Sequence, residues 1–299
     1  MRYIIRSHVK FSHIILAISI ALTWGINFAV AKSAVSYYPT FFLLFLRLVI
    51  TVVFLLPFIK KPNIPFRKLF KVSITLIVLH FSLLYLALSH GLDVSVAVIM
   101  DQMRVPFAAL LAYLTFRETV SKNAILGMIV AIIGTAIIVG SPKITNNITA
   151  LCLSLCASIA WAFYNIQVKN MGKIDTISFI GWISIIGMPF LLVASLIFEH
   201  NQWQILIHSD LKSIISLLYI ALFSTLFAHG MWYYLIKLYK INHIIPYSLL
   251  VPFFGTSAGV IMLGEHLTWQ VIAGGLFTIG GVAIIVTAKP KAAQGGDLS

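Results

Sequence analysis

The sequence predicts an all-α integral membrane protein with ten transmembrane helices, built as two inverted five-helix repeats. Three observations predict this class: the composition, the grouping of apolar residues into ten runs, and the distribution of basic residues between the runs. Of the 299 residues, 60% are apolar and only 10% are charged, and the mean hydropathy is +1.01. A soluble domain usually has about 25% charged residues. The composition therefore excludes a water-soluble enzyme, a disordered protein and a disulfide scaffold.

Each of the ten runs is long enough to cross a membrane as a helix, which needs about 20 apolar residues. The runs are 11–31, 40–59, 72–90, 94–116, 123–140, 148–168, 176–197, 213–236, 244–263 and 269–288. The first run is too long for the apolar core of a signal peptide, which has about 7–15 residues, so it is interpreted as a retained helix. The loops between the runs are too short to hold a soluble domain.

Basic residues predict the orientation of the chain. With the N-terminus in the cytoplasm, sixteen of the 21 Lys and Arg residues fall on the cytoplasmic side. Only Lys32, Lys143 and Lys212 fall outside, and Arg47 and Arg104 lie within spans. Because cytoplasmic loops of membrane proteins are rich in Lys and Arg, both termini are expected in the cytoplasm of a multi-pass inner-membrane protein. The net charge of +13 is then a topology signal, and no nucleic-acid partner is expected.

The two halves of the chain share four ordered matches. These are Trp24 and Lys32 with Trp161 and Lys169, Val105-Pro106-Phe107 with Val251-Pro252-Phe253, Glu118 with Glu265, and Gly127 and Gly134 with Gly274 and Gly281. Since each half holds an odd number of spans, the second half must enter the membrane from the opposite side, as in many secondary transporters. We expect one repeat over 11–140, a second over 148–288, and a cytoplasmic tail over 289–299.

Several of these residues also form family motifs. They are Trp24-Gly25-Ile26-Asn27-Phe28, Leu46-Arg47, Pro106 with Glu118, and Pro252 with Gly264-Glu265 and Gly281. On these motifs the chain resembles the EamA family of the drug/metabolite transporter superfamily over about residues 11–288. It looks most like bacterial exporters of O-acetylserine and related cysteine-pathway metabolites. The resemblance implies a ten-helix bundle, with spans 1–4 and 6–9 around a central cavity, that exports an amino acid or a derivative.

Charged residues at membrane depth are candidates for substrate binding because they are costly to insert. Asp101 and Arg104 are three residues apart, so they share a helix face. They could neutralise each other, or they could bind the ammonium and the carboxylate of a zwitterion, with Gln102 beside them. Arg47 could reach the membrane interface, pair with Asp101 or a helix C-terminus, or contact substrate.

Aromatic and polar residues near the predicted midplane are further candidates for the substrate site. Trp24 and Trp161 lie at similar depths in spans of opposite direction, with Asn27 and Tyr164 at equivalent places beside them. They could line the cavity or serve only in packing. His229 could carry a coupling proton or make a packing hydrogen bond.

Two prolines occupy matching places in the fourth and ninth spans. Pro106 and Pro252 each remove a helical hydrogen bond, so a kink is expected at each, with either a gating or a purely structural role. Tyr247 precedes Pro252 as Asp101 precedes Pro106, which makes Tyr247 a candidate for the cavity wall. The paired glycines predict close packing of the fifth and tenth spans, with a homodimer seam as the alternative.

The function expected from these features is secondary-active transport of a small polar metabolite by alternating access, most simply export, with a proton as the candidate coupling ion. No cofactor or metal is expected: the two cysteines, Cys152 and Cys156, have no histidine or carboxylate neighbours. The chain has no phosphate-binding GxxxxGK[ST] loop, and its eight acids are scattered. We therefore do not expect an enzyme. A membrane-embedded enzyme that modifies lipids and an uptake permease remain the alternatives.

Overall fold

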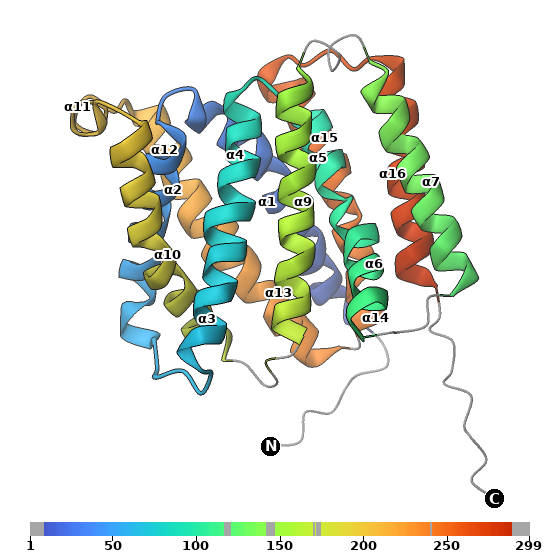
Figure 1. Cartoon of the computed structure of the whole chain (residues 1–299), viewed down its shortest axis with the longest axis horizontal. Helices are drawn as coiled ribbons and strands as arrows, with labels where there is room; N and C mark the ends of the chain where they lie inside the picture. The colour runs from blue at the N-terminus through green and yellow to red at the C-terminus, as the bar shows by residue number, and fades with distance from the viewer. Residues whose placement is uncertain are drawn as a thin grey trace, which may run out of the picture.

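The computed structural model describes residues 9–116, 121–141, 147–169, 171, 175–239 and 241–288. Within these residues, ten helical segments are long and apolar enough to cross a membrane, and they stand side by side as a bundle (Figure 1). The prediction of an all-helical chain with ten candidate spans is confirmed. The inverted arrangement and the side on which the termini lie stay predictions. Glu118, Lys143 and the tail over 289–299 lie outside the described residues.

Several spans are built from more than one helical element. The first five spans are α1 (Phe11–Val35), α2 (Thr40–Leu55) with η1 (Leu56–Phe58), α3 (Phe66–Val72) with η2 (Ser73–Phe81) and α4 (Ser82–Ser89), α5 (Val94–Asp101) with α6 (Arg104–Phe116), and α7 (Lys122–Val139). The second five are α9 (Ile148–Lys169), α10 (Thr176–Phe198), α12 (Leu211–Leu218) with η3 (Tyr219–Ala228) and α13 (His229–Leu238), α14 (Ile241–Ser248) with α15 (Leu250–Leu263), and α16 (Trp269–Thr287). A short helix, α11 (Gln202–Ile207), connects α10 to α12.

The third span begins earlier than the hydropathy pattern predicts. It starts at Phe66 rather than at residue 72, because the basic first turn of α3 is helical although it is not apolar. The other boundaries agree with the predicted runs to within a few residues at most ends.

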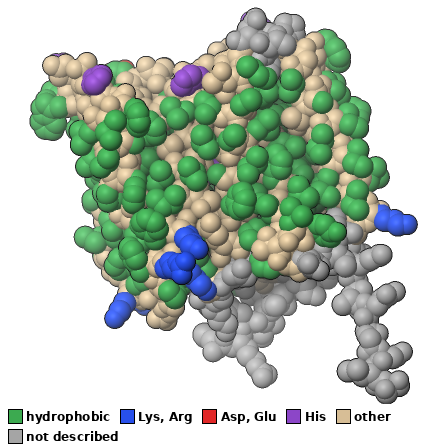
Figure 2. All heavy atoms as spheres, in the orientation of Figure 1, with side chains coloured by type: hydrophobic (Ala, Val, Ile, Leu, Met, Phe, Trp, Pro, Cys, Tyr) green, Lys and Arg blue, Asp and Glu red, His purple; other side chains and the backbone are tan. Residues whose placement is uncertain are grey.

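The surface of the bundle is apolar over most of its height. Side chains such as Ile261 and Phe198 are 81% and 72% exposed, and apolar side chains cover the face seen in Figure 2. The Lys and Arg side chains visible there lie towards the end of the bundle at which α16 finishes. Lipid-facing helices of a membrane protein have this pattern, since the bilayer core accepts apolar groups and excludes charge. The chain is a multi-pass membrane protein.

Helices from the two halves pack against each other throughout the bundle. α1 packs on α15, α2 on α10, α7 on α16, and α6 on α9. Residues that lie between these pairs therefore belong to an interface between the two halves of the chain.

The paired glycines of α7 and α16 bring these two helices into backbone contact. A Cβ added to Gly134 would lie 2.5 Å from the carbonyl oxygen of Gly274, and one added to Gly127 would lie 2.6 Å from that of Gly281. These glycine faces are therefore occupied within the chain, in agreement with the packing interpretation. A homodimer stays a prediction, and it would need another surface.

Two kinds of irregular backbone recur in corresponding spans. The third span of each half contains a π-helical segment, η2 and η3. The fourth span of each half is interrupted shortly before a proline: between α5 and α6 before Pro106, and at Leu249 before Pro252. Since Pro106 has no N–H for the carbonyl of Gln102, that carbonyl accepts a hydrogen bond from the N–H of Val105 at 3.0 Å instead.

Candidate functional site

The interruption in the fourth span holds the acid and the base that the sequence places inside the membrane. Asp101 ends α5 and Arg104 begins α6. The Nη1 atom of Arg104 lies 2.7 Å from Oδ2 of Asp101, and their side chains are 18% and 4% exposed. The guanidinium also lies 4.6 Å from the ring centroid of Trp161, which stabilises it through a cation–π contact. The two charges neutralise each other in this structure.

Neighbouring side chains support this interruption. The Ser158 hydroxyl of α9 donates a hydrogen bond of 2.9 Å to the carbonyl of Met100, in the last turn of α5. Gln102 is 2% exposed, and its Nε2 atom has no hydrogen-bond partner. An unpaired buried amide is costly. Gln102 therefore offers a donor to an acceptor group that enters the site.

His80 lies beside this ion pair, in the π-helical segment η2. Its Nδ1 atom is 2.9 Å from the carbonyl oxygen of Ala157. Because a carbonyl oxygen only accepts, Nδ1 carries the proton and Nε2 is left as the titratable atom. The ring is buried and close enough to Asp101 and Arg104 to interact with both electrostatically. The sequence singled out His229 as a proton carrier, yet His80 is the histidine of the two that interacts electrostatically with Asp101.

Arg47 forms a second polar group with residues of both halves. It is 3% exposed. Its Nε atom donates to the hydroxyl of Thr225 at 3.0 Å, its Nη1 atom donates to the hydroxyl of Tyr85 at 3.4 Å, and its guanidinium lies 4.2 Å from the ring centroid of Phe81. Among the described residues, no carboxylate lies within ion-pair distance of Arg47. Its charge is met by hydroxyl groups and an aromatic face, and not by Asp101 or by the membrane interface.

Asn27 of α1 adjoins this second group. Its side chain interacts with the hydroxyl of Tyr85, whereas its Oδ1 atom is buried without a hydrogen-bond partner. Asn27 and Gln102 therefore provide an unpaired acceptor and an unpaired donor near the two arginines.

Trp24 and His229 form a third group, around the backbone of η3. The Nε1 atom of Trp24 donates to the carbonyl of Ser224 at 3.3 Å, and Nδ1 of His229 lies 2.9 Å from the same oxygen. The rings of Trp24 and His229 meet edge to face with centroids 5.1 Å apart, and the ring centroids of Trp24 and Trp232 are 5.4 Å apart. As for His80, the carbonyl fixes the proton of His229 on Nδ1.

The three groups are continuous through the two π-helical segments. His80 and Phe81 are consecutive residues: His80 interacts electrostatically with the first group, and Phe81 contacts Arg47 of the second. Ser224 and Thr225 are consecutive residues that contact the third and the second. Since π-helical segments are frequent at functional sites, their position here marks a polar region that crosses the interface between the halves.

The remaining candidates lie on α9, α14 and α15. The rings of Trp161 and Tyr164 meet edge to face at 5.9 Å. Tyr247 packs against the apolar cluster that includes Ile20 and Ala228. Pro252 is buried in α15. Among the described residues, no group of three or more His, Cys, Asp or Glu side chains is placed to hold a metal ion.

A cavity of about 610 Å³ lies at the end of the bundle where α1 finishes and α12 begins. Its charged lining residues are Lys32, Lys212 and Asp210. We call it the lysine cavity. Sequence reasoning missed it because both lysines were counted only as exceptions to the cytoplasmic distribution of basic residues. That exception was the signal that could have found it.

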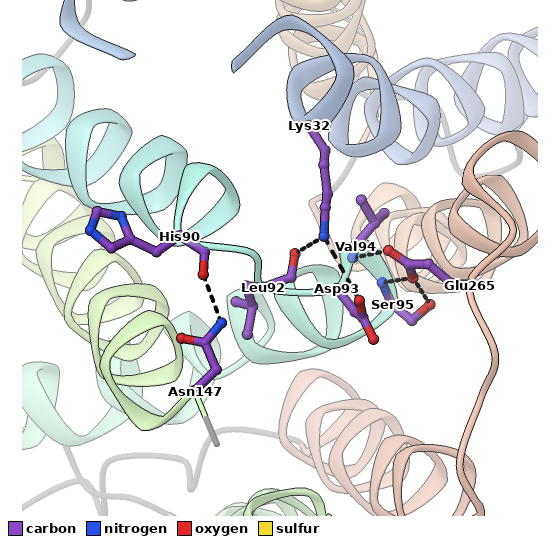
Figure 3. A network of polar contacts seen from close by, with 8 residues as sticks. All are labelled: Lys32, His90, Leu92, Asp93, Val94, Ser95, Asn147 and Glu265. Atoms are coloured by element: carbon purple, nitrogen blue, oxygen red, sulfur yellow. Dashed lines mark hydrogen bonds and ion pairs between the residues drawn. The ribbon is translucent and has the colours of Figure 1, made fainter. Parts of the chain in front are cut away.

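The segment beside the lysine cavity, residues 92–95, is held by Lys32 of α1 and by Glu265, which follows α15 (Figure 3). The Lys32 ammonium donates to the carbonyl of Leu92 and lies 3.8 Å from Oδ1 of Asp93. The Glu265 carboxylate accepts from the backbone N–H groups of Val94 and Ser95, and from the Ser95 hydroxyl. Glu265 therefore satisfies the free N–H groups at the start of α5.

Comparisons with known proteins show the family and the fold of the chain. The model of the EamA-like transporter family matches residues 11–140 and 148–287. A protein of Salmonella typhimurium named "Probable amino-acid metabolite efflux pump" is 30% identical, over 91% of this chain and 93% of its own. A protein of Escherichia coli with the same name is 28% identical, over 91% and 94%. A solved crystal structure matches 92% of this chain and 96% of its own at 14% identity, with a TM-score of 0.63, and so has a similar fold. The chain belongs to the EamA-like transporter family, within the drug/metabolite transporter superfamily, and is a membrane transporter.

Proposed function

We propose that the protein is a secondary-active exporter of a small polar metabolite, an amino acid or a derivative, in the inner membrane. The halves 11–140 and 148–288 move relative to each other so that the site is exposed alternately to the two sides. The relatives named as probable amino-acid metabolite efflux pumps support the direction and the class of substrate. The basic side chains near the end of the bundle where α16 finishes support cytoplasmic termini.

The observation that carries this proposal is the buried ion pair of Asp101 and Arg104 at the interruption of the fourth span. A zwitterion can replace both partners at once: its carboxylate binds Arg104 and its ammonium binds Asp101. Each protein charge then keeps a partner of opposite sign. This matters because a buried charge without a partner would be strongly destabilising. The planar guanidinium suits a carboxylate because it can donate two parallel hydrogen bonds.

The other polar groups complete the proposed site. Arg47 keeps the potential of the site positive, because no described carboxylate pairs with it. Gln102 and Asn27 offer their unpaired amide atoms to polar groups of the substrate. Trp24, Trp161, Tyr164 and Tyr247 provide aromatic walls, and Pro106 and Pro252 set the positions where the helices bend.

Proton coupling is assigned to the histidines of the third and eighth spans. Each has its Nδ1 proton fixed on a backbone carbonyl, which leaves Nε2 to gain and lose a proton. His80 interacts electrostatically with Asp101. Protonation of His80 would therefore favour release of Asp101 from Arg104, and so would link proton entry to opening of the ion pair.

The test begins with a screen of metabolites that accumulate in, or are released from, cells with and without the protein. The compound it finds is then followed by counterflow in proteoliposomes, where saturation distinguishes a carrier from a channel. Asp101→Asn and Arg104→Gln are expected to abolish counterflow. The charge-swapped variant, Asp101→Arg with Arg104→Asp, keeps an ion pair but exchanges the positions of the positive and the negative group that the substrate would meet. We expect it to fold and to remain inactive.

The charge-swapped variant decides between the two interpretations of the pair. Wild-type counterflow in that variant would mean that the pair only neutralises charge in the membrane, and the proposed site would be wrong. Release in the screen without accumulation supports export, whereas accumulation alone would support the uptake alternative. Size-exclusion profiles of the variants report whether each one is folded.

A further inference from the structure

The lysine cavity has the size and the charges of a binding site for a small ion. Its volume of about 610 Å³ lies within the range of about 300–1,000 Å³ that is usual for small-molecule sites. The cavity is lined by two ammonium groups, on Lys32 and Lys212, and by the carboxylate of Asp210. In the predicted topology these are two of only three basic residues on the external side, so the orientation of the chain does not explain their presence.

Lys32 is held in place but retains hydrogen-bonding capacity. Its ammonium donates to the carbonyl of Leu92 and lies 3.8 Å from the carboxylate of Asp93, with side chains 23% and 27% exposed (Figure 3). An ammonium has three N–H donors, and 3.8 Å is long for a hydrogen bond. An incoming carboxylate could therefore bind Lys32 without removing its contact to Leu92.

Asp210 is held in its ionised form. Hydrogen bonds from the Ser213 side chain and backbone, together with the charge of Lys212, lower the pKa of the Asp210 carboxyl from its ordinary value. Its Oδ1 atom accepts from the N–H of Ser213 at 2.9 Å, which caps the start of α12. At neutral pH the cavity wall therefore carries two positive charges and one negative charge.

We propose that the lysine cavity is a second binding site for the transported zwitterion, distinct from the Asp101–Arg104 site. Lys32 and Lys212 bind the carboxylate of an α-amino acid, and Asp210 binds its ammonium group. This inference rests on the proposed function. In the predicted topology the cavity faces the external side, so it holds the exported molecule after it leaves the interface between the halves.

A substrate carboxylate in the cavity competes with Asp93 for Lys32. Lys32 belongs to α1, whereas Asp93 directly precedes α5. The opposite side of this segment is held independently by Glu265, through Val94 and Ser95. Binding therefore weakens the contact between Lys32 and Asp93, and leaves the contacts of Lys32 with Leu92 and of Glu265 with the start of α5 intact.

The experiment measures protection of a cysteine placed in the cavity. Ser36 lines the cavity and is exposed, and the two native cysteines are removed by Cys152→Ser and Cys156→Ser. The full-length Ser36→Cys protein in nanodiscs is labelled with an anionic methanethiosulfonate reagent. The probes are L-serine, L-serine methyl ester, which lacks the carboxylate, and N-acetyl-L-serine, which lacks the ammonium.

We expect L-serine to slow the labelling, N-acetyl-L-serine to do so more weakly, and the methyl ester to have no effect. Lys32→Gln and Lys212→Gln should each raise the half-protecting concentration of L-serine by about tenfold, the effect of losing one charge-assisted hydrogen bond. Asp210→Asn, which keeps the helix cap, should reduce protection by L-serine to the level of N-acetyl-L-serine. Lys122→Gln, at the exposed start of α7, is the matched control and should change nothing.

Three results would overturn the inference: no protection by L-serine, equal protection by the methyl ester, or protection that both lysine variants leave unchanged.

Counterflow by the same preparations separates failure of the cavity site from failure of the proposed function. Protection without counterflow of any screened metabolite would refute transport and leave the cavity site standing. Counterflow without protection would refute only the cavity site.

Discussion

The Nε atom of Arg47 donates a hydrogen bond of 3.0 Å to the hydroxyl of Thr225, and this contact joins α2 of the first half to the π-helical segment η3 of the second. The same hydroxyl donates to the carbonyl of Ile220, five residues earlier, at 2.9 Å. That spacing belongs to a π-helix, in which the carbonyl is offset from its α-helical position. The irregular backbone of η3 therefore positions the oxygen that Arg47 contacts.

Replacing Thr225 with valine should destabilise the protein by about 1–3 kcal/mol, because Arg47 then loses a buried acceptor. Thr225→Ser keeps the hydroxyl and should stay close to wild type. Thermal unfolding in detergent measures both. Thr287→Val removes a hydroxyl that bonds only to the carbonyls of its own helix end, so it is the control. A melting temperature for Thr225→Val equal to that of the control would contradict the assigned role.

Removal of the Glu265 carboxylate should fray the start of α5. Glu265→Ala leaves the N–H groups of Val94 and Ser95 without their acceptor, at an expected cost of about 1–2 kcal/mol. Glu265→Gln keeps one oxygen and should cost less. Hydrogen exchange at the start of α5 is the direct measurement. The control Gln204→Ala, on the exposed helix α11, should leave hydrogen exchange at the start of α5 unchanged. If Glu265→Ala also left this exchange unchanged, the cap would be unimportant.

Adjacent glycines of α16 should respond in opposite ways to alanine. A Cβ on Gly281 would lie 2.5 Å from the carbonyl of Gly127 and from the N–H nitrogen of Ala131, so Gly281→Ala must push α7 away. A Cβ on Gly280 meets nothing within 4 Å, and Gly280→Ala should stabilise the helix slightly, by about 0.5–1 kcal/mol. Melting temperatures of the two variants report the difference. Equal values would show that α7 and α16 are not in backbone contact.

The selectivity of the lysine cavity should not change with pH between about pH 7 and about pH 5. Hydrogen bonds from the Ser213 side chain and backbone favour the ionised form and lower the pKa of Asp210 from its ordinary value. The contribution of this carboxylate is therefore fully present above the ordinary pKa of an aspartate and is lost only as the pH falls through the lowered pKa. The ratio of half-protecting concentrations of L-serine and N-acetyl-L-serine measures this. A ratio that approaches one already near pH 5 would mean that Asp210 does not bind the ammonium group.

Hydropathy predicts the spans well because a membrane helix is selected for an unbroken apolar run. It places the third span too late, since α3 carries Arg67, Lys68 and Lys71 but belongs to the same continuous helical span. The π-helical segments leave no trace in hydropathy, because they change the hydrogen bonding of the backbone without changing its composition.

The candidate site is predicted only in part, for reasons of distance along the chain. Asp101 and Arg104 are three residues apart, so their contact follows from local geometry. The contact of Arg47 with Thr225 does not follow from local geometry, since Thr225 is 178 residues away and is brought to Arg47 by packing of the two halves. Likewise, no local pattern places Lys32 beside Lys212.

The short helix α5 has one further consequence. It has eight residues and is therefore about 12 Å long; it begins directly after Asp93, the partner of Lys32, and ends at Asp101, the partner of Arg104. One rigid element thus has an acid at each end, and the two proposed ligand positions lie at its two ends. Thermodynamic linkage requires any such coupling to be reciprocal: if a molecule at one end of α5 weakens binding at the other by some factor, the second molecule weakens the first by the same factor. A carrier built in this way would discourage simultaneous loading of both ends, and so would favour departure of one molecule before the next is taken up.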